Sequence, residues 1–423
     1  MAFHFDVDKI RADFPACSRT INGAPIAYLD GPAGSQIPQC VIDRMVKCMV
    51  EQTANEDGNF DPGFYARGLE DETRAAAADL LGCDADEVGF SCSSTQNSFN
   101  LAMSYSKQLQ PGDELIVTQI DHRCNTASWN SLSRIGCVVK WVRLDPVTMQ
   151  LDFEDFKSKL SPRTKVVAIN WASNALGTVT DVKKYVDLAH EVGAITIVDA
   201  VHYAAHFPID VKAIGTDVLL CSAYKWFGPH IGVMYMRKEL IASIDFNNVK
   251  CDDIAEGARR MHMGTPQYEY LTGVTAAINY IASIGEQYMA DFEQEIAGLS
   301  GRRKNIVAGM LAIDAYEQTL ATRLRHDLRK IPGVKVYGPA EGQPRTPTVV
   351  FTVAGHTPAE VTKILGQRAI NAWDGDYYAV EVIDALGLRE SGGMVRVGMA
   401  PYCTSSDIDR LIYAVRAIAE GDL

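Results

Sequence analysis

The sequence lacks the features that mark membrane, secreted or nucleic-acid-binding proteins. No stretch approaches the ~20 consecutive apolar residues that a membrane-spanning helix needs. The opening residues, MAFHFDVDKIRADFP, contain neither the basic nor the apolar region of a secretory signal. Acidic residues outnumber basic ones and give a formal net charge of −13, so the basic surface that binds phosphate backbones is missing. We therefore expect a cytoplasmic protein that binds small molecules, not nucleic acid or membrane.

Paired cysteines and the motifs of several enzyme classes are also missing. The 10 cysteines form no CxxC pair and no zinc-like cluster, so neither a disulfide framework nor a metal site is predicted. We expect most of them to be small buried side chains. The sequence contains no GxGxxG, GxxxxGK[ST], HExxH or GxSxG. Nicotinamide, P-loop, zinc-protease and α/β-hydrolase chemistry are therefore disfavoured.

The chain does contain a regular alternation of short apolar runs with longer amphipathic ones, from about residue 85. This alternation is typical of β-α units stacked on a largely parallel sheet. The run DVKKYVDLAHEVG predicts one connecting helix, which ends at a glycine. Five runs predict strands: DELIVTQID, VVKWVRLD, KVVAINWAS, AITIVDAVH and DVLLCSAYK. The sequence thus predicts an α/β fold.

The pattern changes after about residue 270. A long helical stretch is followed by short strands such as TPTVVFTV and by a closing helix, SSDIDRLIYAVRAIAE, whose serines we expect to cap it. The 423 residues are enough for a large domain with a smaller one attached. We therefore predict a second, smaller α+β domain.

Polar residues follow several of the predicted strands. Ligands of open α/β sheets gather at the carboxyl ends of the strands, so separated segments can build one site there. The residues concerned are Asp121, His122, Asn174, Asp199, His202, Ser222 and Lys225.

Lys225, in SAYKWFGP, is unusual because lysine is seldom buried without a partner or a function. Asp199 ends the preceding strand, so both side chains reach one crevice. A pyridine-type cofactor needs this pair, with the carboxylate holding the ring nitrogen protonated and the amine forming an imine. A structural Asp–Lys ion pair explains the two residues equally well.

Hydroxyl groups indicate where a phosphate could bind. Ser93, Ser94, Thr95 and Gln96 come directly before an apolar-periodic stretch, so they lie at a helix N-terminus, where anions bind. Simple N-capping is the alternative. The role of His122 also has two interpretations: it is either a stacking or proton-moving group, or a structural residue. Ser222-x-x-Lys225 matches the SxxK of penicillin-binding enzymes, but KTG and SDN are missing.

With these residues the sequence resembles the pyridoxal-phosphate enzymes of aminotransferase class V, especially the cysteine desulfurase and selenocysteine lyase branch. YLDGPAGSQIPQCVID is similar to the family's YLDNAA…PQ.VID signature, DHRCNTASW to EHH.N..PW, and SNALGT to SNVLGT. VDAVH, SAYKWFGPHIGVMY and MGTPQYEYLTGVTAAINYI stand for VDGAQ, S.HK..GP.G.G.LY and AGTPN…G…A..Y. The resemblance covers most of the chain.

The resemblance implies the type I fold of pyridoxal-phosphate transferases. A large domain, residues 17–298, would hold the cofactor on a mostly parallel seven-stranded sheet. Residues 1–16 and 299–423 would form the small α+β domain. A homodimer is implied, in which the neighbouring subunit completes the active site.

The resemblance also implies a role for each matching residue. Lys225 would form the Schiff base with pyridoxal 5′-phosphate, Asp199 would partner the pyridinium nitrogen, and His122 would stack on the ring, so these three are the predicted catalytic residues. The other predicted cofactor-binding residues are Ser94, Thr95, Gln96, Asn174, His202, Ser222, Tyr224 and, from the neighbouring subunit, Thr265. The predicted substrate-binding residues are Asn174, Tyr378 and Arg396, whose guanidinium suits a carboxylate.

Three positions depart from the family pattern. The desulfurases carry a nucleophilic cysteine on a loop shortly before the arginine, but no cysteine lies between Cys251 and Cys403 here. Tyr377 and Tyr378 lie in the replacing segment, where they could contact substrate or simply pack. The other departures are Tyr224 for histidine and His202 for glutamine.

The predicted function is that of an enzyme acting on a small amino acid. After an external aldimine forms, Lys225 would remove the α-proton, and β-elimination would cleave a C–S bond. Because the loop cysteine is missing, epimerase or aminotransferase chemistry of the same family is the alternative. A third possibility is a non-catalytic scaffold, although a scaffold has no need of a buried amine near a buried carboxylate.

Overall fold

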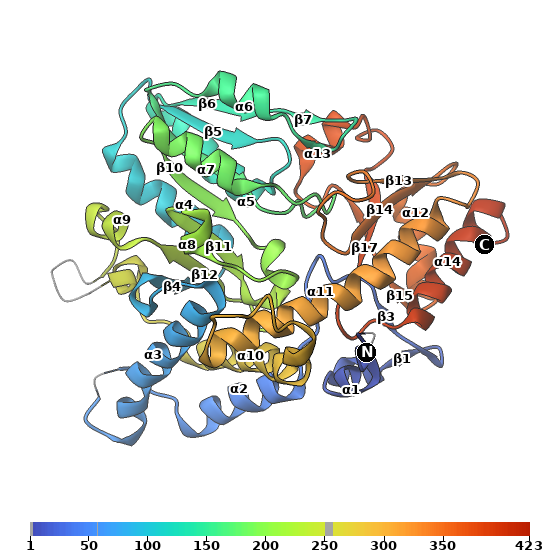
Figure 1. The fold of residues 1–423 in the computed structure, drawn as a ribbon, viewed down its shortest axis with the longest axis horizontal. Coiled ribbons are helices and arrows are strands. Elements are labelled where there is room, and N and C mark those ends of the chain that lie inside the picture. The colour runs from blue at the N-terminus through green and yellow to red at the C-terminus, as the bar shows by residue number, and fades with distance from the viewer. Residues whose placement is uncertain (1–2, 57, 250–256) are drawn as a thin grey trace.

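The computed structural model describes residues 3–56, 58–249 and 257–423. Within these residues the larger sheet has seven strands, drawn in blue to yellow-green in Figure 1. They are β4 (Val88–Ser91), β5 (Glu114–Thr118), β6 (Val138–Val142), β9 (Thr164–Asn170), β10 (Ile195–Asp199), β11 (Val218–Ser222) and β12 (Gly232–Met236). Their order across the sheet is β4-β12-β11-β10-β9-β5-β6. Every neighbouring pair is parallel except those that include β12, which runs antiparallel to β4 and β11.

The α/β prediction is confirmed, and all five predicted strands form: β5, β6, β9, β10 and β11. Strands β10 and β11 are buried at every residue, as expected where helices cover both faces of a parallel sheet. The predicted connecting helix is α7 (Val182–Glu191), which buries Val182, Tyr185, Val186 and Ala189. The chain therefore places the ends of β9, β10 and β11 side by side.

The smaller domain has an antiparallel sheet of four strands within the described residues. Its strands are β13 (Val334–Tyr337), β14 (Thr348–Val353), β16 (Trp373–Gly375) and β17 (Met394–Gly398), in the order β13-β14-β17-β16. Helices α12 (Pro358–Gln367) and α14 (Ser405–Glu420) pack beside it (Figure 1). Thr404, not a serine, caps α14. Its hydroxyl oxygen accepts the Asp407 N–H, and its hydroxyl group donates to the Asp407 carboxylate. The serine-cap prediction was therefore wrong by one position.

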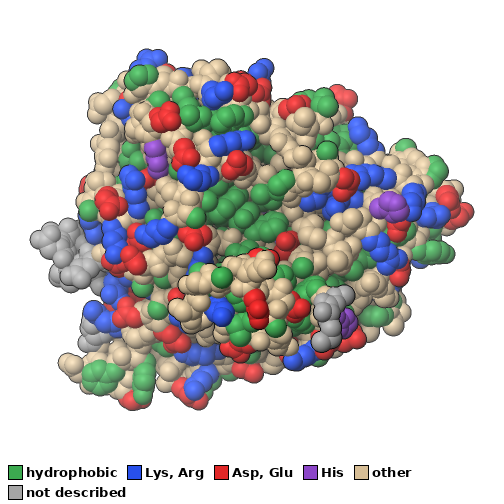
Figure 2. All heavy atoms as spheres, viewed as in Figure 1, with side chains coloured by type: hydrophobic (Ala, Val, Ile, Leu, Met, Phe, Trp, Pro, Cys, Tyr) green, Lys and Arg blue, Asp and Glu red, His purple; other side chains and the backbone are tan. Residues whose placement is uncertain are grey.

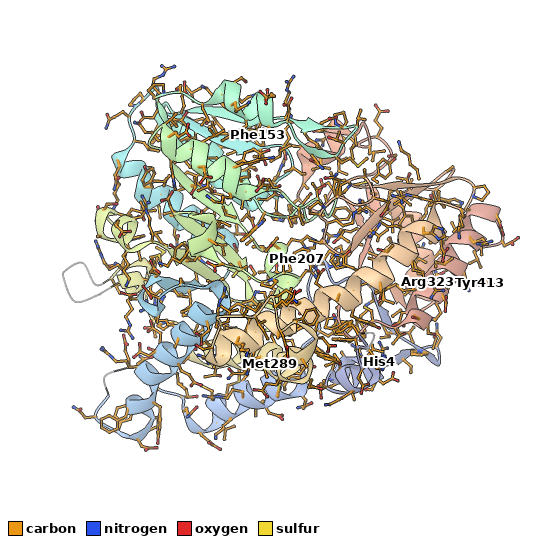
Figure 3. All side chains as sticks on the ribbon, viewed as in Figure 1. His4, Phe153, Phe207, Met289, Arg323 and Tyr413 are labelled. Carbon is orange, nitrogen blue, oxygen red and sulfur yellow. The ribbon has the colours of Figure 1, made fainter. Side chains whose placement is uncertain are left out.

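Two long helices join the domains. The predicted helical stretch folds as α10 (Tyr268–Tyr288) and α11 (Gly301–Leu328), and α11 runs from α10 to the smaller sheet (Figure 1). At the far end of α11, Arg323 forms an ion pair with Asp409 of α14; Arg323 and the exposed Tyr413 are labelled in Figure 3. The boundaries at residues 16/17 and 298/299 stay a prediction.

The charges on the surface and the burial of the cysteines match what the composition predicted. Acidic and basic side chains are interspersed over the face in Figure 2. No helix in the described ranges is long and apolar enough to cross a membrane. Among the nine cysteines that the structure describes, five are buried: Cys17, Cys48, Cys137, Cys221 and Cys403. Cys251 lies outside the described residues.

Helices α10 and α11 approach so closely that their contact requires glycine. A Cβ at Gly309 would overlap the carbonyl oxygen of Ile281, and one at Gly285 would overlap that of Asn305. We expect Gly309→Ala to lower the free energy of unfolding by about 3 kcal/mol, because the new Cβ would clash with the rigid helical backbone at Ile281. Chemical denaturation measures this.

Gly68 offers a matched control. It lies inside α3 (Asp61–Leu81), and a Cβ there meets nothing within 4 Å. Gly68→Ala should therefore raise the free energy of unfolding by up to about 1 kcal/mol, the helix-propensity gain alone. Equal effects of the two substitutions would contradict close packing of α10 against α11.

Candidate active site

A cavity of about 870 Å³ lies at the carboxyl ends of the central strands, where the larger sheet faces β16 and β17. The structure brings most of the predicted site residues to it. Those lining it are Ser94, Thr95, His122, Asn174, Asp199, His202, Ser222, Tyr224, Lys225, Tyr378 and Arg396. Gln96 and Thr265 instead line a separate pocket of about 190 Å³. The Gln96 side chain turns back to accept the Cys92 N–H at 3.1 Å.

Lys225 follows β11 in a short 3₁₀ turn and is buried. Its Nζ donates to the carbonyl oxygen of Pro32. Burial, helped by the nearby Arg396 charge, lowers the pKa of Lys225 to about 7. A substantial share of the side chain is therefore a neutral amine at neutral pH, the form that acts as a nucleophile or base.

Asp199 ends β10 with both carboxylate oxygens held by donors. The Val201 N–H donates to Oδ1 at 2.9 Å, and the Cys124 thiol donates to Oδ2 at 3.5 Å. Burial raises the pKa of Asp199. Among the described side chains no close ion pair joins Asp199 to Lys225, so the direct ion pair of the alternative does not form, although each charge shifts the pKa of the other group in the favourable direction. The two groups face one cavity without touching each other.

His122 is the N-cap of α5 (Arg123–Asn130). Its Nδ1 accepts the Cys124 N–H at 3.0 Å, which fixes the ring orientation. Burial lowers the pKa of His122 to about 4, and the charges of Lys225 and Arg396 act in the same direction. The imidazole is therefore neutral at physiological pH and presents a flat uncharged ring to the cavity.

This lowered pKa predicts a pH dependence of stability. The folded protein keeps His122 neutral down to pH ~4, whereas the unfolded chain takes up a proton near pH 6.5. Lowering the pH from 6.5 to 4 therefore favours unfolding through this group, by about 1.4 kcal/mol per pH unit. We expect His122→Asn, which keeps a side-chain acceptor for the cap, to lack this loss. Denaturation curves of both proteins across this range give the difference directly, and parallel curves would contradict a neutral His122.

His202 lines the cavity and is the first of two buried neighbouring histidines. Its Nε2 lies 2.8 Å from Thr348 Oγ1 and 3.1 Å from Thr346 Oγ1, while its buried Nδ1 has no partner in the described chain. Burial lowers the pKa of His202 well below the usual value. His206 lies behind it, next to Phe207 of Figure 3, and its Nδ1 is 2.7 Å from Glu317 Oε2. Burial lowers the pKa of His206 to about 4 and raises that of Glu317, so the His206 imidazole and the Glu317 carboxyl group are both uncharged.

Hydroxyl groups gather at the N-terminus of α4 (Ser94–Tyr105). Ser93 caps this helix by accepting the Gln96 N–H at 3.1 Å, so the alternative of simple N-capping is confirmed for Ser93. Ser94 is buried, and its Oγ has no partner among the described residues. Ser222 lines the same cavity from the end of β11. Because free N–H groups and a spare hydroxyl meet at a helix N-terminus, this end of the cavity suits an anion.

Arg396 enters the cavity from β17. Its Nη1 donates to the Asn174 carbonyl oxygen at 2.7 Å, and its guanidinium lies 4.1 Å from the centroid of the Tyr377 ring. No carboxylate in the described chain forms an ion pair with Arg396, and its buried Nε has no partner. Burial lowers the pKa of Arg396 to about 10, which leaves it charged. The Asp30 charge acts on Arg396 without forming an ion pair with it, and a buried cation without a directly paired anion is costly, so an anionic ligand fits here.

The structure adds Cys124, which the sequence did not assign to the site, and it distinguishes Tyr377 from Tyr378. Cys124 lines the cavity and bonds to Asp199, but its position after His122 carries no motif of its own. Tyr377 is buried with its ring on Arg396, whereas the predicted Tyr378 is exposed and lies 5.5 Å from the His122 ring. Neighbouring tyrosines look alike in a sequence, so their different burial was not predictable. Groups of three or more potential metal-binding side chains are absent from the described residues.

Comparisons with known proteins agree over nearly the whole chain. The sequence profile described as Aminotransferase class-V matches residues 27–303 and 304–411. A probable cysteine desulfurase of Mycolicibacterium paratuberculosis is 32% identical over 434 residues, which are 99% of this chain and 59% of that protein. The chain thus spans little more than half the length of this relative.

Two further relatives match along their full length. A cysteine desulfurase of Klebsiella pneumoniae (strain 342) is 29% identical, with 98% of both chains covered. The apo structure of a cysteine desulfurase from Thermococcus onnurineus NA1 superposes with a TM-score of 0.85 at 24% identity, over 99% of both chains. This last likeness shows the fold.

Proposed function

The chain belongs to the aminotransferase class-V family, and we propose that it is a pyridoxal-phosphate-dependent lyase that cleaves the C–S bond of a small amino acid. It is a cysteine desulfurase-like enzyme of a pyridoxal-phosphate-dependent family. The observation that carries the proposal is the buried Lys225, whose pKa falls to about 7 inside a cavity that also holds Asp199. A neutral amine and a buried carboxylate are the two groups that this cofactor requires.

The residues present fit pyridoxal 5′-phosphate. The N-terminus of α4 and the spare Ser94 hydroxyl fit a phosphate, with Thr95, Ser222 and Tyr224 in the same lining. Asp199 and the stacking ring of His122 fit a pyridine ring, and the unpartnered Nδ1 of His202 fits a phenolic oxygen. When bound, the cofactor supplies an aldehyde for amines and a ring that accepts electrons.

The chain's own residues would then divide the work. Arg396 and Asn174 hold the substrate carboxylate, which fixes the α-carbon next to Lys225. Lys225 would remove the α-proton of the bound substrate, because its pKa is near the working pH. The carboxylate of Asp199 would keep a proton on the ring nitrogen of the bound cofactor. Loss of the α-proton then expels the sulfur substituent from the β-carbon.

Elimination is favoured over desulfuration by the position of the thiols. No cysteine lies between residues 252 and 402. Cys403, after the arginine, is buried, and burial raises its pKa well above the usual value. A protonated buried thiol is a poor nucleophile. Persulfide formation on a loop cysteine, which the resemblance to the desulfurases implies, therefore has no counterpart in the replacing segment.

A homodimer is part of the proposal. Thr265 is exposed and lies outside the main cavity of its own chain, which suits a residue donated to the neighbouring subunit. Gln96 is retained as a proposed cofactor ligand only through the backbone at the start of α4, since its side chain is directed to Cys92.

One experiment tests the function. The visible spectrum of the purified protein is recorded with added pyridoxal 5′-phosphate and again after L-cysteine, while sulfide, pyruvate and alanine are assayed in the same tube. Sulfide with pyruvate supports the lyase, and sulfide with alanine indicates a desulfurase. A bound-cofactor band with neither product indicates epimerase or aminotransferase chemistry, and the absence of any band indicates the scaffold.

A further inference from the structure

Three exposed aromatic side chains line the same cavity as Lys225. They are Phe99 of α4, Trp373 of β16 and Tyr378, with exposed fractions of 40%, 51% and 69%. We name these three residues the aromatic rim. Single exposed apolar residues are normal, but aromatic groups gathered on one cavity usually mark a binding site.

The backbone around Tyr378 is held in an unusual conformation. Tyr377 and Tyr378 have φ values of 55° and 59°, in the left-handed region that bulky residues avoid. Bonds from the other domain hold them there: Asn174 Nδ2 donates to the Tyr377 carbonyl oxygen at 2.8 Å, and the Arg123 N–H donates to that of Tyr378 at 2.7 Å. Strain that the surroundings enforce is typical of ligand-binding segments.

Charged groups beside the rim are already engaged. Arg123 pairs with Glu381 at 3.3 Å, and Asp376 accepts the Tyr378 N–H at 2.9 Å. Asp374 accepts the Thr362 hydroxyl at 2.7 Å. Asp374 and Asp376 keep their negative charges, because their partners are neutral donors, so the rim disfavours an anionic group, and its three ring faces favour an uncharged, flat one.

The cavity also has no thiol suited to accept sulfur. Cys124 is the one cysteine among its described lining residues, and its thiol is bonded to Asp199. Burial and the Asp199 charge raise the pKa of Cys124 well above the usual value, so it stays protonated. The sulfur atom released from the β-carbon therefore leaves the cavity with its substituent still attached, because no thiol among the described lining residues accepts it.

We propose that the substrate is an S-substituted cysteine whose flat apolar substituent packs against Phe99, Trp373 and Tyr378. This inference rests on the proposed lyase function and specifies its substrate class. The Cα–H and Cβ–S bonds break, the sulfur leaves as a thiol that takes up one proton, and water converts the remaining three-carbon fragment to pyruvate and ammonium. No oxidant or reductant is required.

The test compares S-benzyl-L-cysteine with L-cysteine as substrates of the dimeric protein loaded with pyridoxal 5′-phosphate. We expect kcat/KM to be higher for S-benzyl-L-cysteine, and the ratio of the two values to fall about tenfold in Trp373→Ala, the loss of one aromatic contact. Tyr413→Ala is the matched control, because Tyr413 is 70% exposed on α14, away from the cavity (Figure 3). That variant should keep the wild-type ratio.

Calorimetry with a protein that cannot turn over separates the two proposals. Lys225→Ala protein with cofactor is titrated with S-benzyl-L-cysteine, with and without Trp373→Ala. Weaker binding in the double variant supports the role of the aromatic rim, whether or not any amino acid is turned over. If no amino acid is turned over, the lyase function is contradicted but the binding role of the rim is not. An unchanged substrate ratio with unchanged binding overturns the rim, as expected if a second copy of the chain covers these side chains.

Discussion

Lys225→Ala is expected to lower kcat by at least about 10³-fold and to remove the visible band that cofactor bound through an imine gives. The substitution deletes both the amine that holds the cofactor and the base that moves the α-proton, and general-base catalysis alone contributes about 10²–10⁴-fold. Steady-state kinetics and the absorbance spectrum measure the two losses independently.

Lys183→Ala is the matched control for Lys225. Lys183 is an exposed lysine on α7 that pairs with Asp187 at 2.8 Å, and it does not line the cavity. Its removal should change neither the spectrum nor kcat. Added methylamine should restore part of the Lys225→Ala activity, because a small amine can occupy the vacated volume. Wild-type kcat in Lys225→Ala would mean that another group is the base.

The sequence predicted the larger sheet and the cavity residues at the ends of its strands for one physical reason. Strands buried on both faces read as continuous apolar runs, and their first polar residue marks the strand end. Asp199, Ser222 and Lys225 follow such runs, so their meeting point could be foreseen. The resemblance to class-V enzymes added Arg396, which periodicity alone would not have joined to these strand ends.

What could not be predicted depends on side-chain directions and on tertiary contacts. Gln96 stands next to Thr95 in the sequence, but its amide oxygen accepts the Cys92 N–H and leaves the cavity. The left-handed backbone of Tyr377 is imposed by contacts with Asn174, which lies far away in the chain. Local propensity opposes this conformation, so only the folded structure reveals it.

The unpaired charge of Arg396 predicts opposite changes in activity and stability. Arg396→Met keeps much of the side-chain volume but removes a guanidinium that forms no ion pair with any carboxylate in the described chain. Removing the buried charge should raise the free energy of unfolding by about 1 kcal/mol, after the lost bond to Asn174 and the lost contact with the Tyr377 ring. Without the guanidinium the substrate carboxylate loses about two charged hydrogen bonds, so kcat/KM should fall about 10²–10³-fold.

Most of this fall should appear in KM. The carboxylate of the substrate does not change charge during the reaction, so Arg396 binds the substrate and the transition state almost equally well. Arg416→Met, an exposed arginine on α14, controls for the loss of one charge and should alter neither quantity. Steady-state kinetics and denaturant titrations of the cofactor-free protein provide the two measurements. A stable Arg396→Met protein with an unchanged KM would show that the buried cation binds something other than the substrate carboxylate.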